Sequence, residues 1–145
     1  MAQELILLPA FFMVLLTIFV WVYMLKMRIN GMKENRVHPE KMKSQQAKSL
    51  LPEHASISAE NFSNIFEIPT LFYVLLGFIY MTQSTSTSLL VLACAYVLLR
   101  IMHSAITLTY NKVMHRFPTY VLSCLVLWAM WADFACNLIA DKNLF

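Results

Sequence analysis

Charged and hydrogen-bonding side chains recur at helical spacing inside long apolar stretches of this sequence. One stretch carries Tyr96, Arg100, His103, Thr107 and Asn111, spaced four, three, four and four residues apart. Residues three or four apart share one face of a helix, so these side chains form a continuous polar stripe. Such residue types can pair charges, carry protons or line a site, and packing alone does not require so many of them. The stripe favours a polar cavity.

Two further polar stripes flank it in the sequence. One consists of Glu60, Asn64 and Glu67; the other begins with Arg116 and Tyr120 and continues through Ser123 and Leu127. We expect the three stripes to meet, and we expect Arg100 to form an ion pair with Glu67, which would neutralise two charges at low dielectric. The same pair could serve only to fix the helix register.

Asp133 stands apart from these stripes. It lies thirteen positions from Tyr120, about 220° around a helix, and so points away from the Arg116 face. We expect it to meet a subunit interface or the inner core. A structural hydrogen bond is favoured over a proton-carrying role.

The cysteines and histidines show no pattern of a metal or redox site. Cys94, Cys124 and Cys136 all lie in apolar runs, without a CxxC motif. The default interpretation is buried structural thiols. Because no second His or Cys lies at ligand spacing from His103, we expect no metal site.

The composition shows which elements must position these residues. The chain has 145 residues, of which 59% are hydrophobic and 13% charged, with a mean hydropathy of +0.62. A soluble domain of this composition would lack the polar residues to cover its surface. A helix needs roughly 20 apolar residues to cross a bilayer. Four segments qualify: residues 5–25, 62–81, 89–110 and 119–140. We therefore predict one all-α domain, an integral membrane four-helix bundle over residues 1–145.

The connections predict the orientation. Seven of the eleven Lys and Arg residues lie between Lys26 and Lys48, mostly in the predicted loop 28–61, and the third loop adds Lys112 and Arg116. The positive-inside rule puts both loops in the cytoplasm. The basic cluster lacks the interleaved aromatics of a nucleic-acid site, so no nucleic-acid partner is expected. We interpret the first segment as a retained helix. The C-terminal residues carry no retention signal, which favours a bacterial inner membrane over the endoplasmic reticulum.

Three short motifs resemble a known family. The segments 60–69 (ENFSNIFEIP), 100–103 (RIMH) and 116–120 (RFPTY) resemble the MAPEG family, the membrane-associated proteins of eicosanoid and glutathione metabolism. The spacing from Arg100 to Arg116 is similar to that of the prostaglandin-E synthase branch. The resemblance covers nearly the whole chain and is that of a bacterial-type member.

The resemblance implies a homotrimer of four-helix protomers that binds glutathione between subunits, near the cytoplasmic side. It implies that Arg116 and Tyr120 are catalytic, with Arg116 stabilising the glutathione thiolate. The glutathione-binding residues that it implies are Asn64, Glu67, Arg100, His103 and, less directly, Arg28.

The implied activity is that of a glutathione-dependent transferase or peroxidase acting on lipophilic electrophiles or lipid hydroperoxides. An alternative is a non-catalytic lipid-binding protein. Glu60 and Thr107 motivate it, because they stand where the glutathione-using members carry an arginine and a tyrosine. A third hypothesis, a small proton or ion pathway, rests on Glu67, Arg100, His103 and Asp133, which do not form one continuous line.

Overall fold

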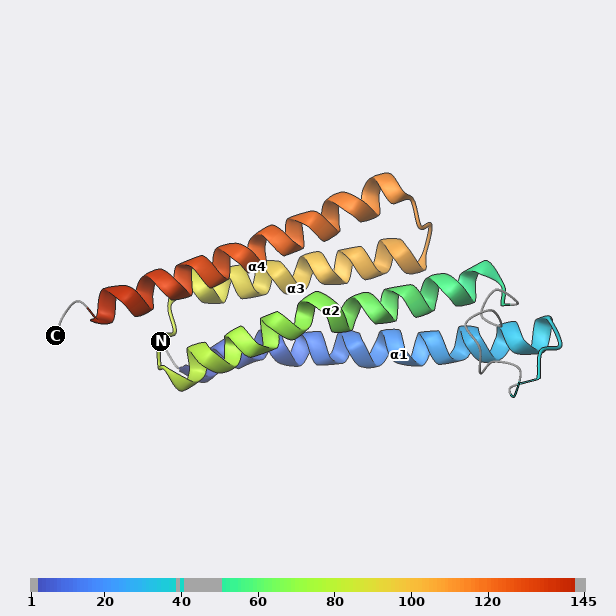
Figure 1. The fold of residues 1–145 in the computed structure, drawn as a ribbon, viewed down its shortest axis with the longest axis horizontal. Coiled ribbons are helices and arrows are strands. Elements are labelled where there is room, and N and C mark those ends of the chain that lie inside the picture. The colour runs from blue at the N-terminus through green and yellow to red at the C-terminus, as the bar shows by residue number, and fades with distance from the viewer. Residues whose placement is uncertain (1–2, 39, 41–50, 143–145) are drawn as a thin grey trace.

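The computed structural model describes residues 3–38, 40 and 51–142 and consists there of four long helices (Figure 1). A short 3₁₀ helix, η1 (Gln3–Leu7), leads into α1 (Leu8–Glu34), which is followed by α2 (Glu53–Met81), α3 (Thr87–Leu108) and α4 (Val113–Lys142). The end of α1, the start of α2 and the α3–α4 connection lie at one end of the bundle, which we call the two-loop end. The start of η1, the α2–α3 connection and the end of α4 lie at the other end. The middle of the predicted loop 28–61 falls outside the described residues.

Each helix is long and apolar enough to cross a membrane. The helices differ from the predicted spans mainly in length, since α1 continues to Glu34 and α2 begins at Glu53. These extensions carry polar residues, so an estimate based on apolar length stops short of them. A helix keeps its backbone hydrogen bonds after it leaves the hydrocarbon, and nothing requires it to end there.

Local sequence explains several helix boundaries. Pro9 lies in the first turn of α1, where a missing backbone N–H costs little. Ser86 caps α3, its hydroxyl accepting a hydrogen bond from the Leu89 N–H at 3.2 Å. Arg36 and Gln83 follow α1 and α2 with positive φ angles of 51° and 56°, a conformation that commonly terminates helices.

The helices pack mainly as two pairs, α1 with α2 and α3 with α4. Between the pairs lies an apolar core in which Phe72 stacks on Tyr96 with ring centroids 4.5 Å apart. The residues of this core are completely or almost completely buried, and every helix contributes to it. They include Met13, Leu75, Ile79, Leu89, Leu127 and Met130. The polar stripe of α3 continues this buried face toward the two-loop end.

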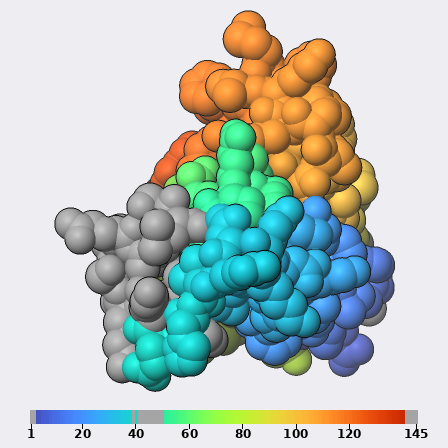
Figure 2. Space-filling view, turned by 90° about the vertical axis from the view of Figure 1, so that its right-hand side faces the viewer, coloured from blue at the N-terminus to red at the C-terminus, as the bar shows by residue number. Residues whose placement is uncertain are grey.

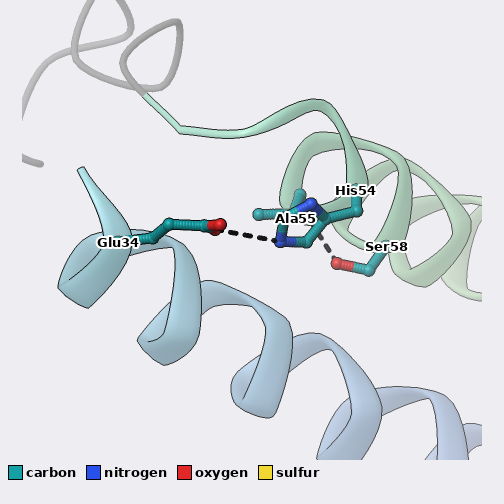
Figure 3. A network of polar contacts seen from close by, with 4 residues as sticks. All are labelled: Glu34, His54, Ala55 and Ser58. Carbon is teal, nitrogen blue, oxygen red and sulfur yellow. Dashed lines mark hydrogen bonds and ion pairs between the residues drawn. The ribbon is translucent and has the colours of Figure 1, made fainter.

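At the two-loop end, α1 and α2 approach closely. A Cβ atom added at Gly31 would lie 2.8 Å from Pro52 Cδ. Nearby, His54 at the start of α2 faces Glu34 of α1 at 3.9 Å, and Ser58 donates to the Ala55 carbonyl (Figure 3). Seen from this end, the start of α2 lies between α1 and the α3–α4 connection (Figure 2). The close contact therefore fixes α2, which carries one of the polar stripes.

The outward faces are strongly apolar, as expected of helices in contact with lipid. Phe11, Leu15 and Phe19 on α1 are 65%, 61% and 60% exposed on the protomer. The expectation of buried thiols is wrong for Cys94 and Cys136, which are both exposed, while Cys124 is half-buried. In a membrane helix an apolar stretch can face lipid as well as the core, so apolar neighbours do not predict burial.

Candidate functional site

The polar stripes of α3 and α4 meet near the two-loop end and line a cavity of about 210 Å³. Its walls come from α2, α3 and α4, and its lining residues are Asn64, His103, Val113, Arg116, Phe117 and Tyr120. Four of them were singled out from the sequence: Asn64, His103, Arg116 and Tyr120. The cavity thus combines an amide, an imidazole, a guanidinium and a phenol.

Arg116, in the first turn of α4, is held at both its backbone and its side chain. Its carbonyl accepts hydrogen bonds from His103 Nδ1 at 3.1 Å and from the Thr119 hydroxyl at 2.8 Å. Its guanidinium Nη1 donates to Asn111 Oδ1 at 3.0 Å. The His103 contact requires the proton on Nδ1, and it ties α3 to α4 beside the cavity.

Arg100 lies deeper, behind the Tyr120 ring. Only 2% of the residue is exposed, and its guanidinium carbon lies 5.6 Å from the Tyr120 ring centroid and 5.9 Å from that of Tyr96. Both distances are within the range of a cation–π interaction. Nη2 donates to the Asn64 backbone carbonyl at 2.6 Å. The guanidinium is therefore held between three helices.

Several buried nitrogen atoms at this site have no hydrogen-bond partner within the described residues. Nε and Nη1 of Arg100 donate no hydrogen bond within the described part of the chain, and Nε2 of His103, which is an acceptor when the proton is on Nδ1, accepts none. Buried polar groups are nearly always paired, and an unpaired buried charge is especially costly. Arg116 on the cavity wall and Arg100 behind the Tyr120 ring therefore give this region an excess of positive charge, which suits an anion.

The expected ion pair between Arg100 and Glu67 is not formed within the described residues of this protomer. Glu67 is exposed on α2, whereas Arg100 is buried and reaches the backbone of Asn64, one turn away. Helical periodicity places residues on one face of their own helix but does not fix the rotation of that helix relative to its neighbour. Glu60, on the same stripe as Glu67, is also exposed.

Two other sequence candidates lie away from the cavity walls. Arg28 is half-buried on α1, which contributes no lining residue. Thr107 is buried and donates its hydroxyl to the His103 carbonyl at 2.8 Å. A threonine here thus completes a hydrogen bond within α3 and adds no group to the cavity.

The residue spacing predicts that Asn111 belongs to the α3 stripe, but it gives no reason to include Asn111 in the site. In the structure the Asn111 side chain contacts Arg116. An asparagine just beyond the end of a helix is a known signal for a left-handed residue, and Asn111 has a φ angle of 45°. That signal predicts the backbone conformation. The contact with Arg116 also depends on how the α3–α4 connection turns, which no local pattern determines.

Asp133 lies toward the opposite end of the bundle. Its carboxylate accepts hydrogen bonds from the Ser88 hydroxyl at 2.7 Å and from Asn137 Nδ2 at 3.3 Å. Ser88 lies in the first turn of α3, whereas Arg116 lies beyond the last turn of that helix. The contact therefore joins α3 and α4 at the end opposite Arg116. This geometry is that of a structural hydrogen bond between helices.

Comparison with known proteins identifies the family of the chain. No curated protein and no solved structure matches the chain. The sequence profile of the MAPEG family matches residues 6–136, which include α1, α2, α3, most of α4 and every residue of the cavity. Together with four helices able to cross a membrane, this match shows a multi-pass integral membrane protein. The chain belongs to the MAPEG family.

Proposed function

We propose that the protein is a glutathione-dependent transferase or peroxidase that acts on lipophilic electrophiles or lipid hydroperoxides. The family includes glutathione transferases and peroxidases. The observation that carries the proposal is the position of Arg116, whose guanidinium lines a cavity together with Tyr120 and His103. This combination is suited to a thiolate, because a small anion is stabilised by a positive charge placed beside it.

The residues present fit glutathione. The tripeptide has two carboxylates, an amine and a thiol; within the described residues, Arg100 has two unpaired donor nitrogens that suit a carboxylate, and His103 Nε2 is an unpaired acceptor that suits the amine or the thiol. Asn64 adds an amide on the cavity wall. Charge-assisted hydrogen bonds from a guanidinium to a carboxylate are among the strongest in proteins, so an anionic ligand would relieve the cost of burying Arg100.

When bound, glutathione supplies a thiol nucleophile. A free thiol has a pKa of about 8.5 and is only slightly ionised at neutral pH. The Arg116 guanidinium lowers the pKa of a thiol placed beside it, because a nearby positive charge favours the thiolate. Arginine remains charged even at the edge of a membrane, so this effect persists. The lipophilic acceptor enters from the bilayer.

We infer that the complete site forms in a homotrimer, as is consistent with the family. A cavity of about 210 Å³ is smaller than the roughly 300–1,000 Å³ of typical ligand pockets. Glu67 and Arg28 lie outside the cavity of one protomer, where a neighbouring subunit can bring them to the ligand. The two-loop end faces the cytoplasm, and a bacterial inner membrane is the favoured location.

The proposal is tested by equilibrium binding of glutathione to the purified protein in detergent, with thiolate absorbance followed as the pH is varied. We expect wild type to bind glutathione and lower its thiol pKa, and Arg116→Ala to lose that shift while remaining trimeric. Lys112→Ala is the matched control, because it removes one exposed positive charge from the α3–α4 connection, four residues before Arg116. An unchanged thiol pKa in Arg116→Ala would contradict the mechanism.

The second candidate is a non-catalytic lipid-binding protein. Two apolar depressions between α1 and α3, of about 520 and 430 Å³, share Ile101 and favour it. On this hypothesis lipid copurifies with the protein, and millimolar glutathione does not bind at any pH. The same binding measurement therefore separates the two candidates.

A further inference from the structure

The side chain of Asn111 reaches across the α3–α4 connection to Arg116. Its amide oxygen accepts the Arg116 Nη1 hydrogen bond at 3.0 Å. Both residues are half-buried, so the bond is partly shielded from water. Among the hydrogen bonds of the described residues, this is the one that holds the Arg116 guanidinium.

The backbone around Asn111 is fixed on both sides. Its N–H donates to the Ile106 carbonyl in the last turn of α3 at 2.9 Å. The next residue, Lys112, accepts hydrogen bonds from the N–H groups of His115 and Arg116, both at 3.0 Å, which start α4. Asn111 itself has a φ of 45°, a conformation rare for residues other than glycine and asparagine. The connection therefore presents the amide to Arg116 from a rigid support.

We propose that Asn111 is a positioning residue, which orients the Arg116 guanidinium toward the thiol. This inference rests on the proposed function of the site. Asn111 occupies one donor atom of Arg116 and leaves the remaining donors for the ligand. A free arginine side chain has high conformational entropy, so fixing it in advance lowers the cost of binding.

The chemistry of asparagine suits this role. Its amide oxygen is a neutral acceptor, so Arg116 keeps its full positive charge for the thiolate. An aspartate would accept the same hydrogen bond but would offset that charge. Glycine would tolerate the backbone conformation and provide no acceptor. The two substitutions therefore separate orientation from charge.

The test compares Asn111→Asp and Asn111→Gly with wild type by glutathione binding and by the pKa of the bound thiol. For Asn111→Asp we expect the thiol pKa to rise by about one unit, because a carboxylate beside Arg116 offsets its charge. For Asn111→Gly we expect affinity to fall about 3- to 10-fold, since Arg116 must be ordered on binding. Thermal unfolding shows whether each variant folds.

Gln83→Gly is the matched control. Gln83 also has a positive φ angle beyond a helix end, but it lies at the opposite end of the bundle. Its replacement changes a left-handed residue to glycine without touching Arg116, so affinity and thiol pKa are expected to equal those of wild type.

The outcomes separate the inference from the proposed function. If both Asn111 variants keep wild-type affinity and thiol pKa while Arg116→Ala loses them, Asn111 is not a positioning residue and the proposed function stands. If Arg116→Ala also has no effect, both fail. A further measurement needs no ligand: ¹⁵N NMR reports the rate at which the Arg116 guanidinium rotates. We expect this rate to be faster in Asn111→Gly than in wild type. An unchanged rotation rate would also overturn the inference.

Discussion

The guanidinium of Arg100 on α3 donates to the backbone carbonyl of Asn64 on α2 across 2.6 Å. This hydrogen bond joins two helices through a charged group that is almost completely buried. It uses one of the three nitrogen atoms of the guanidinium, and the other two have no partner in the described part of the chain. Such an arrangement costs stability in the free protein, and an anionic ligand would recover that cost.

Arg100→Met is therefore expected to separate stability from binding. Methionine has a similar length, carries no charge and packs adaptably, so replacement of the arginine removes the cost of burying an unpaired charge. We expect the ligand-free variant to unfold at the same or a higher temperature than wild type, and glutathione affinity to fall at least about 10-fold. Thermal unfolding with and without glutathione measures both. A large drop in the ligand-free unfolding temperature would show that Arg100 is mainly structural.

The contact between Gly31 and Pro52 makes a second prediction. In Gly31→Ala the new methyl group would lie 2.8 Å from Pro52 Cδ, which belongs to a rigid ring, so α1 and α2 must separate. Overpacking of this kind destabilises proteins by about 1–3 kcal/mol. Gly77→Ala is the matched control, because, apart from its chain neighbours and the backbone of its own helix, no atom of the described residues lies within 4 Å of the added Cβ. Since alanine favours helices over glycine, we expect Gly77→Ala to be stabilising by up to about 1 kcal/mol. Equal effects of the two substitutions would contradict the close packing.

The sequence was sufficient to predict the four helices and their class. Apolar runs of about 20 residues determine a membrane-spanning helix almost alone, because the bilayer requires every backbone group to be satisfied within the segment. The polar stripe of α3 also shows in the structure as one buried face that includes Tyr96, Arg100 and His103. Periodicity predicts this well, because the face of a single helix depends only on residue spacing.

Relations between helices were harder to predict. The Arg100–Glu67 pair failed because it needed the rotation of α2 against α3, and the expected burial of Cys94 failed because apolar residues can face lipid. The contact between Asn111 and Arg116 depends on the path of a short connection. In each case the missing information is the packing between elements, and spacing within one segment does not contain it.

The hydrogen bond between Ser88 and Asp133 predicts a structural role at the end opposite the cavity. Removing the carboxylate in Asp133→Ala is expected to lower the free energy of unfolding by about 1.5–3 kcal/mol, the usual contribution of a hydrogen bond to a charged group. A double-mutant cycle with Ser88→Ala isolates the energy of this pair. Glutathione affinity is expected to stay at the wild-type value. If wild type in liposomes carried a proton flux and Asp133→Ala abolished it, that result would instead support a proton-carrying role.

The exposed carboxylate of Glu60 makes the last prediction. It lies one turn before Asn64 on α2, and glutathione carries net negative charge, so the two repel each other. In Glu60→Arg the repulsion becomes attraction, and we expect glutathione to bind about 3- to 10-fold more tightly. The gain should shrink at high salt, because exposed charges are screened. Glu53→Arg is the matched control, since it makes the same charge change at an exposed position near the start of α2, almost two turns further away. A gain confined to Glu60→Arg would place glutathione beside this helix face, whereas an equal gain in both variants would reflect only net charge.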